Sequence, residues 1–252
     1  MNTRTLYSFF RSSTSYRLRI ALALKGLEHE TRFVSLPKMQ HRDADYMSVN
    51  PQGLLPALIE PDGRVFAQSL AMLEYLDETY PEPALLPADP FQRSYVRMMS
   101  QIVACDMHPL NNVRVLKYLG QRWKFPEADV NEWYAHWIAE GFRSFETTLR
   151  QYGLHGRFCL GDEVSMADIC LVPQVANARR PLLHRGRTAA HLRRAGARIH
   201  RTPVDARHNG RRDCHRLRLR DLALRLTRKT PRPIVFSDRF FRRHPSASTV
   251  RP

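Results

Sequence analysis

The chain has 252 residues, a hydrophobic fraction of 43% and a formal net charge of +16 at pH 7. The first 180 residues are enough for one substantial core or two smaller ones, and the four cysteines (Cys105, Cys159, Cys170 and Cys214) include no CxxC pair. Without a secretory signal or an apolar run of membrane-spanning length, the sequence favours a reduced, cytoplasmic protein and argues against a disulfide framework, a zinc site or a membrane protein.

The net positive charge comes entirely from the C-terminal part of the sequence. Residues 181–252 contain 19 arginines, one lysine and four aspartates, whereas residues 1–180 contain 20 basic and 20 acidic residues. The C-terminal part also lacks Glu, Gln, Met, Tyr and Trp, all of which the first 180 residues use. We therefore expect two different kinds of sequence that join near Arg180.

The first predicted elements are a strand over Thr5–Phe10 and a helix over Leu18–Leu24 that Gly26 closes. Between them lies a hydroxyl-rich run, Ser12-Ser13-Thr14-Ser15-Tyr16-Arg17. The exposed N–H groups at a helix start favour negative charge, and a bound thiolate is one anion that would profit. The alternative is that Ser12 and Ser13 only cap the helix.

Residues 31–80 predict the rest of a small α/β sandwich. Thr31–Leu36 is a plausible strand, and two further strands over Leu54–Glu60 and Arg64–Ala67 flank the turn Pro61-Asp62-Gly63. Ser69 then caps a helix that leads to Tyr80.

From Asp89 onward the pattern is helical. One predicted helix starts at Pro90 and runs through Val103 towards Leu119. A second covers Val130–Tyr152, with Trp133, Trp137, Phe142 and Phe145 mostly facing a core. Ser165 and Asp168 fit a capping box, so we interpret Asp168 as structural.

Several motifs occur in an order that resembles the zeta class of glutathione transferases, the family of maleylacetoacetate isomerase. The serine-rich run with Leu18-Arg19-Ile20-Ala21-Leu22 behind it is similar to that class's signature, although the family often has Cys at Thr14 and Trp at Tyr16. The other matching segments are Asn50-Pro51, Leu55-Pro56-Ala57-Leu58, Gln68-Ser69, Leu85-Leu86-Pro87, residues 161–168 and residues 171–180. The resemblance covers about residues 4–180.

The resemblance implies an α/β thioredoxin-like domain over residues 1–83, an all-α domain over residues 89–180, a homodimer and glutathione as the cofactor. Ser12, Ser13 and Thr14 would surround the sulfur, and Arg11 and Arg180 would be the cationic partners of the developing enolate and of the substrate carboxylates. The remaining predicted glutathione contacts are Ser15, Tyr16, Arg17, His41, Leu55, Pro56 (whose peptide bond is cis in this fold), Gln68, Ser69, His108, Asn112, Val113 and Arg114.

The implied activity is a glutathione-dependent cis–trans isomerisation of a small dicarbonyl acid, namely maleylacetoacetate to fumarylacetoacetate in aromatic amino-acid breakdown. Thiolate addition, bond rotation and elimination would regenerate glutathione. Two alternatives remain open: maleylpyruvate isomerase, which the segment Cys105–Pro109 resembles, and a general zeta-class transferase. No metal is implied.

The C-terminal helices of the family are missing or replaced by residues 181–252, which we expect to be a disordered basic tail. As a genuine extension, the tail would bind nucleic acid by charge, but Phe236, Phe240 and Phe241 come only near its end and no nucleic-acid motif is present. The other hypothesis is a reading-frame slip just after Arg180, because a GC-rich gene read out of frame yields Arg, Ala, Pro, Gly, His and Leu. We favour the slip, which would leave an inactive product.

Overall fold

The computed structural model describes residues 3–179 and begins with the predicted β-α-β order. β1 (Thr5–Ser8) pairs in parallel with β2 (Glu30–Phe33), and α1 (Ser13–Leu24) connects them. The helix ends as predicted, because Gly26 adopts φ +64°, a left-handed conformation that glycine reaches without a steric penalty. The strand ends two residues earlier than predicted, at Ser8.

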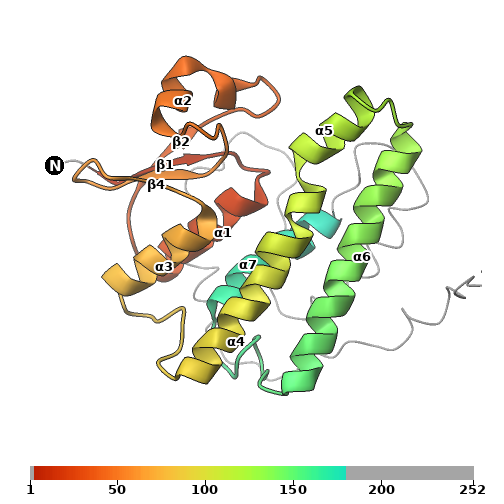
Figure 1. Cartoon of the computed structure of the whole chain (residues 1–252). Helices are drawn as coiled ribbons and strands as arrows, with labels where there is room; N and C mark the ends of the chain where they lie inside the picture. Colours follow the sequence, from red (N-terminus) through yellow and green to blue (C-terminus); the bar gives the residue numbers. More distant parts are fainter. Residues whose placement is uncertain (1–2, 180–252) are drawn as a thin grey trace, which may run out of the picture.

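The second half of this domain completes a four-stranded sheet in the order β2-β1-β3-β4. After the 3-10 turn η1 (Gln40–Arg42) and α2 (Ala44–Val49) come β3 (Ala57–Ile59), β4 (Val65–Ala67) and α3 (Ser69–Thr79). β3 is antiparallel to both β1 and β4. Figure 1 shows α2 on one side of the sheet and α1 and α3 on the other. The predicted thioredoxin-like domain is confirmed.

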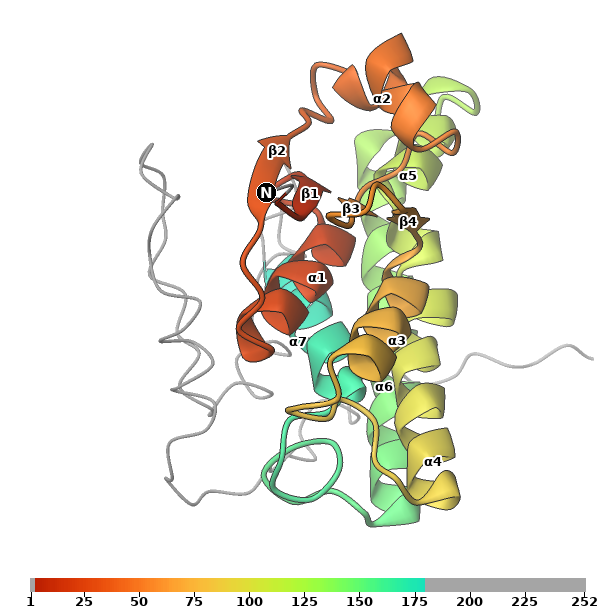
Figure 2. The same cartoon turned by 90° about the vertical axis from the view of Figure 1, so that its left-hand side faces the viewer.

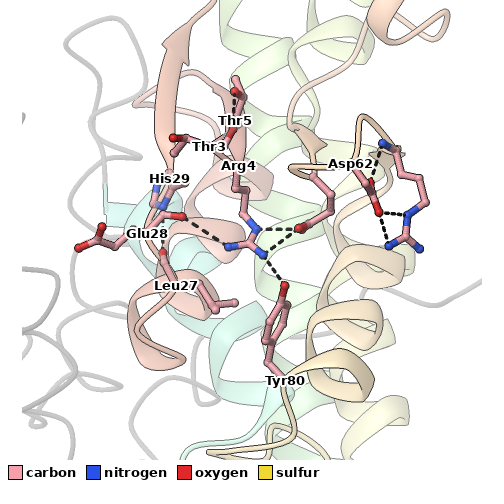
Figure 3. Close-up of polar contacts among 10 residues, drawn as sticks. Thr3, Arg4, Thr5, Leu27, Glu28, His29, Asp62 and Tyr80 are labelled. Carbon is pink, nitrogen blue, oxygen red and sulfur yellow. Dashed lines mark hydrogen bonds and ion pairs between the residues drawn. The ribbon is translucent and has the colours of Figure 1, made fainter. Parts of the chain in front are cut away.

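Arg4, which directly precedes β1, forms a buried ion pair with Glu60, which directly follows the neighbouring strand β3 (Figure 3). Arg4 and Glu60 are 7% and 4% exposed, and the Arg4 Nε and Nη2 atoms each donate to a Glu60 carboxylate oxygen at 2.8 Å. Arg4 Nη2 also donates to the Tyr80 hydroxyl at 2.7 Å. Buried charges are tolerated when they are paired and hydrogen-bonded in this way, so this contact is structural.

The helical domain is more broken than the sequence predicts. In place of one helix from Pro90 towards Leu119, α4 (Pro90–Gln101) is followed by a π-helical turn η2 (Ile102–Met107), a 3-10 turn η3 (Pro109–Asn111) and α5 (Val113–Gln121). Pro109 cannot donate a helical hydrogen bond, and the Asn112 side chain accepts from Arg114 N at 3.1 Å to start α5 afresh. The prediction of a continuous helix was therefore wrong.

The next helix, α6 (Glu127–Tyr152), begins three residues before the predicted start at Val130. Its buried residues are Tyr134, Ile138, Phe145 and Leu149. Trp133 and Trp137 are only half-buried, and the Trp133 indole donates to the Leu110 carbonyl at 2.9 Å. Of the four aromatic residues expected mostly to face a core, Phe145 is buried and Phe142 packs against the core cluster, whereas the two tryptophans are only half-buried.

The last described helix, α7 (Met166–Arg179), packs against both α1 and α4 (Figures 1 and 2). One apolar cluster runs through the contact and contains Leu18 and Leu22 of α1, Met99 of α4 and Val175 of α7. The two domains therefore share a core.

Half of the predicted capping box is present at the start of α7: the Asp168 side chain accepts from Ser165 N, whereas Ser165 Oγ donates to the same carboxylate instead of accepting from Asp168 N. Asp168 accepts hydrogen bonds from Ser165 N, Ser165 Oγ and Cys159 N at 2.9, 2.7 and 2.9 Å. Burial raises the pKa of this carboxyl, and the hydrogen bonds oppose that shift. Asp168 is structural, as predicted.

Within residues 3–179, no helix combines the length and the apolarity needed to cross a membrane. The predicted basic tail over residues 181–252 and the predicted catalytic Arg180 lie outside the described residues.

Candidate active site

The serine-rich run forms the start of α1. Ser12 is the N-cap residue in an extended conformation, and its Oγ accepts from Ser15 N at 3.2 Å. The first-turn N–H groups of a helix have no partner inside the helix and carry part of the positive end of its dipole. The predicted cap is therefore present, and it leaves room for the predicted anion site, which remains a prediction at the same helix start.

Thr14 connects this helix start to the segment before β3. Its Oγ1 donates to the Leu55 carbonyl at 2.8 Å and lies 2.8 Å from Ser12 Oγ. A carbonyl only accepts, so the Thr14 proton is used there and Ser12 is the donor in the second contact. The Leu55-Pro56 peptide bond is cis, as predicted.

His108 brings the helical domain to the same helix start. Its Nδ1 lies 3.2 Å from Ser13 Oγ, and Asn112 Nδ2 lies 3.4 Å from its Nε2. Because Asn112 Oδ1 already accepts from Arg114 N, the amide presents its N–H to Nε2, so Nε2 accepts and Nδ1–H donates to Ser13. This arrangement leaves the Ser13 hydroxyl proton available for another acceptor.

The imidazole of His108 is held neutral. Desolvation, followed by the charges of Arg17 and Arg114, lowers its pKa to about 3. A neutral ring is consistent with an accepting Nε2.

Arg17 and Ser69 form a second group of predicted residues. Arg17 Nη1 donates to Ser69 Oγ at 3.1 Å, and both side chains are buried. Ser69 is the first residue of α3, and the N-cap is Gln68 at φ +68°. The prediction that Ser69 caps this helix was wrong, because the helix begins one residue earlier than expected and Gln68 is its N-cap. The Ser69 hydroxyl instead accepts from Arg17.

One residue beside this group, Gln52, is not among the predicted site residues. Gln68 Nε2 donates to Gln52 Oε1 at 2.9 Å, so the two amides together offer further donors and acceptors. Gln52 lies in the turn-rich run Asn50–Gly53, and no local signal distinguishes it from an ordinary turn residue.

The other predicted site residues do not share one network. Ser15 is fully buried, and its Oγ accepts from Phe9 N at 3.4 Å, while the Arg19 guanidinium lies over the Tyr16 ring. Burial and the charges of Arg42 and Lys117 lower the pKa of His41, whose Nδ1 is buried without a hydrogen-bond partner. The remaining predicted residues within the described range, Arg11, Val113 and Arg114, are exposed.

Among residues 3–179, the three cysteines are free thiols, and no group of three or more His, Cys, Asp and Glu side chains is placed to hold a metal ion. The polar groups that form the candidate site are therefore hydroxyls, amides, one neutral imidazole and one buried guanidinium.

Two family models match this chain. The N-terminal domain of glutathione S-transferase matches residues 11–79, and the C-terminal domain of glutathione S-transferase matches residues 131–201. The second match runs past Arg180, where we predict that the resemblance ends.

Individual relatives agree with the family models. The maleylacetoacetate isomerase of Rattus norvegicus is 48% identical over 177 residues, which is 69% of this chain and 78% of that protein. A holo structure of maleyl pyruvate isomerase, a bacterial zeta-class enzyme, is 46% identical with a TM-score of 0.68, covering 70% of this chain and 82% of the other.

A third relative was solved with small molecules bound. The maleylacetoacetate isomerase of Methylobacterium extorquens AM1, with bound malonate and glutathione, is 39% identical with a TM-score of 0.67, over 69% of this chain and 81% of the other. From the domain matches, the shared fold and these identities, we conclude that the chain belongs to the glutathione S-transferase family, in its zeta class.

Proposed function

We propose that this chain is a glutathione-dependent cis–trans isomerase that converts maleylacetoacetate to fumarylacetoacetate. The observation that carries the proposal is the start of α1, where Ser12, Ser13 and Thr14 gather hydroxyls at a helix N-terminus and His108 reaches them from the helical domain. Relatives named as this isomerase at 39% and 48% identity support it.

The residues present fit glutathione, a thiol with two carboxylates. Two donor-rich helix starts lie in this domain, one at Ser12–Thr14 and one at Ser69, and each suits an anion. When bound, glutathione supplies a thiolate that adds to the cis double bond and leaves after the bond has rotated.

The chain's contribution is to stabilise the negative charge of the thiolate. A free cysteine thiol has a pKa of about 8.5, and a helix N-terminus lowers such a value. The Ser13 proton is available to an anion, and the Ser12 proton can turn from Thr14 towards one, because a hydroxyl rotates about its Cβ–Oγ bond. Arg11 and Arg180 would meet the substrate carboxylates.

The substrate is tested by measuring turnover of maleylacetoacetate and of maleylpyruvate by the purified full chain with glutathione. We expect a higher kcat/KM for maleylacetoacetate. The reverse order would favour maleylpyruvate, the substrate in the name of the bacterial zeta-class relative solved in its holo form.

In the same assay, Ser12→Ala should lower kcat about hundredfold, as the loss of one preorganised donor does in other enzymes. The control Ser48→Ala removes an exposed hydroxyl on α2. With an intact reading frame, no turnover of either substrate by this chain would contradict the proposal. With a slip after Arg180, the corrected chain is the one to assay, and its failure to turn over either substrate would contradict the proposal.

The homodimer and the cytoplasmic location implied by the resemblance belong to this proposal. Light scattering of the purified chain tests the dimer.

A further inference from the structure

A buried positive charge without a counter-charge lies behind the start of α3. Arg17 is 1% exposed, and its Nε and Nη2 atoms are buried without any hydrogen-bond partner. Its one hydrogen bond goes to the neutral hydroxyl of Ser69, and no ion pair of Arg17 occurs within residues 3–179.

This arrangement is costly for the protein alone. Arginine cannot lose its proton in a protein, so it cannot escape the penalty of burial by becoming neutral. Arg4 shows the ordinary solution in the same domain, a buried guanidinium that forks onto the carboxylate of Glu60. Arg17 has no such partner, which points to an anion that comes from outside the described chain.

The hydrogen bond between Arg17 and Ser69 has only one possible direction. A guanidinium donates and never accepts, so Ser69 Oγ accepts from Arg17 and its own proton is left to donate elsewhere. Ser69 is the first residue of α3, an 11-residue helix, so the unpaired N–H groups of the first turn lie at the same end. The Arg17 guanidinium, the Ser69 hydroxyl and the first-turn N–H groups each have a donor left to present, and the set therefore favours an anion.

We propose that Arg17 is a positioning residue of the glutathione site: it turns the Ser69 hydroxyl towards the γ-glutamyl carboxylate, whose charge compensates the buried guanidinium. The proposal rests on the proposed function, since it takes glutathione as the ligand. The neighbouring Gln52–Gln68 amide pair selects the γ-glutamyl end over the glycyl end. Only the γ-glutamyl end carries an ammonium beside its carboxylate, and amides can both donate to the carboxylate and accept from the ammonium.

The first test compares the full chain with Arg17→Met, which keeps the length of the side chain and removes its charge. Glutathione should bind about tenfold more weakly to the variant, the value for one charge-assisted hydrogen bond. In turnover, the KM for glutathione should rise with little change in kcat, because Arg17 acts on binding rather than on the sulfur.

Thermal unfolding separates this role from a structural one. Replacing a buried charge that has no partner with an apolar side chain of similar size is often neutral or stabilising. We therefore expect the ligand-free Arg17→Met variant to melt no lower than the parent chain, while the rise in Tm caused by glutathione becomes smaller. A variant that melts lower and binds glutathione as well as the parent would overturn the proposal.

Two glutathione analogues locate the interaction. 4-Aminobutanoyl-cysteinyl-glycine lacks only the γ-glutamyl carboxylate, and glutathione with an amidated glycine lacks the other one. The decarboxylated analogue should bind equally to the parent chain and to Arg17→Met, whereas the glycinamide should keep the full tenfold difference. The opposite result would overturn the assignment to the γ-glutamyl end.

Ser69→Ala provides an independent variant should Arg17→Met fail to fold. It should weaken glutathione binding and leave binding of the decarboxylated analogue unchanged. Binding without any isomerisation would contradict the proposed function alone, and a parent chain that does not bind glutathione would overturn both proposals.

Discussion

At the scale of single residues, His108 is held in an environment that excludes its charged form. The Asn112 amide donates to one ring nitrogen, and the nearby Arg17 and Arg114 oppose a positive charge. The ring can therefore orient Ser13 without competing for the proton of a bound thiol. An imidazolium here would have two donating nitrogens, one of them facing the N–H of Asn112.

The free energy of unfolding should reflect this environment of His108. Its pKa is about 3 in the folded chain and about 6.5 in an unfolded one, so only the unfolded state takes up this proton between those values. The stability contributed by the neutral ring is present above about pH 6.5 and is lost at about 1.4 kcal/mol per pH unit as the pH falls towards 3. Urea unfolding at pH 7 and pH 5 measures it.

His108→Asn keeps an amide where Nδ1 lies and does not titrate, so its stability should fall less between pH 7 and pH 5. His136→Asn, an exposed substitution on α6, is the matched control and should follow the parent chain. Equal losses in the parent and in His108→Asn would show that the ring is not held neutral.

At the scale of elements, the start of α7 depends on one carboxylate. Asp168→Ala would leave Ser165 N, Ser165 Oγ and Cys159 N without their acceptor in a buried place. Three unsatisfied buried donors should together lower the free energy of unfolding by about 3 kcal/mol. Chemical denaturation measures this loss, and Glu163→Ala, an exposed acid in the same loop, should change stability by less than about 0.5 kcal/mol. A similar effect of both substitutions would contradict the assigned role.

The elements that the sequence predicts well are those with local signals. The hydroxyl run before α1, the turn at Pro61-Asp62-Gly63 and the capping box at Ser165 each carry their own chemistry within a few residues. These local elements fix the hydroxyls of the site at Ser12, Ser13 and Thr14.

The interruption after α4 could not be predicted in this way. A π-helical turn adds one residue to a turn without changing the apolar character of Ile102–Met107, so the pattern still indicates a helix. Packing supplies the missing information: a side chain on Gly141 of α6 would place a Cβ 2.6 Å from Met107 Cε. This close approach between η2 and α6 is a long-range contact, and so is the contact between His108 and Ser13.

At the scale of the whole molecule, the shared core explains why a site can be built from both domains. α1 supplies the hydroxyls of the site on one face and contributes Leu18 and Leu22 to the apolar cluster that α4 and α7 complete. Ion pairing adds to this contact, since Arg97 of α4 donates through two nitrogens to Glu74 of α3. The helical domain, residues 89–179, thereby keeps its own residue His108 in contact with the start of α1.

The distribution of charge along the chain leads to the last prediction. The whole net charge of +16 lies after Arg180, in residues without a single Glu, Gln, Met, Tyr or Trp. Such a change in composition is expected from a shifted reading frame, so sequencing the gene across the codons for Gln174 to His184 should find one base gained or lost. The net charge of the corrected chain should then be close to zero, as it is for residues 1–180.

An intact frame across these codons would contradict that prediction. The family model of the C-terminal domain matches the chain up to residue 201, beyond Arg180, so the sequencing result decides between a shifted frame and a genuine C-terminal segment. The basic segment would then be a real part of the protein. Its charge would make binding to DNA fall steeply with salt, and deletion of residues 181–252 would abolish that binding. Equal binding by a poly-arginine peptide of the same charge would show that the segment acts through charge alone and reads no sequence.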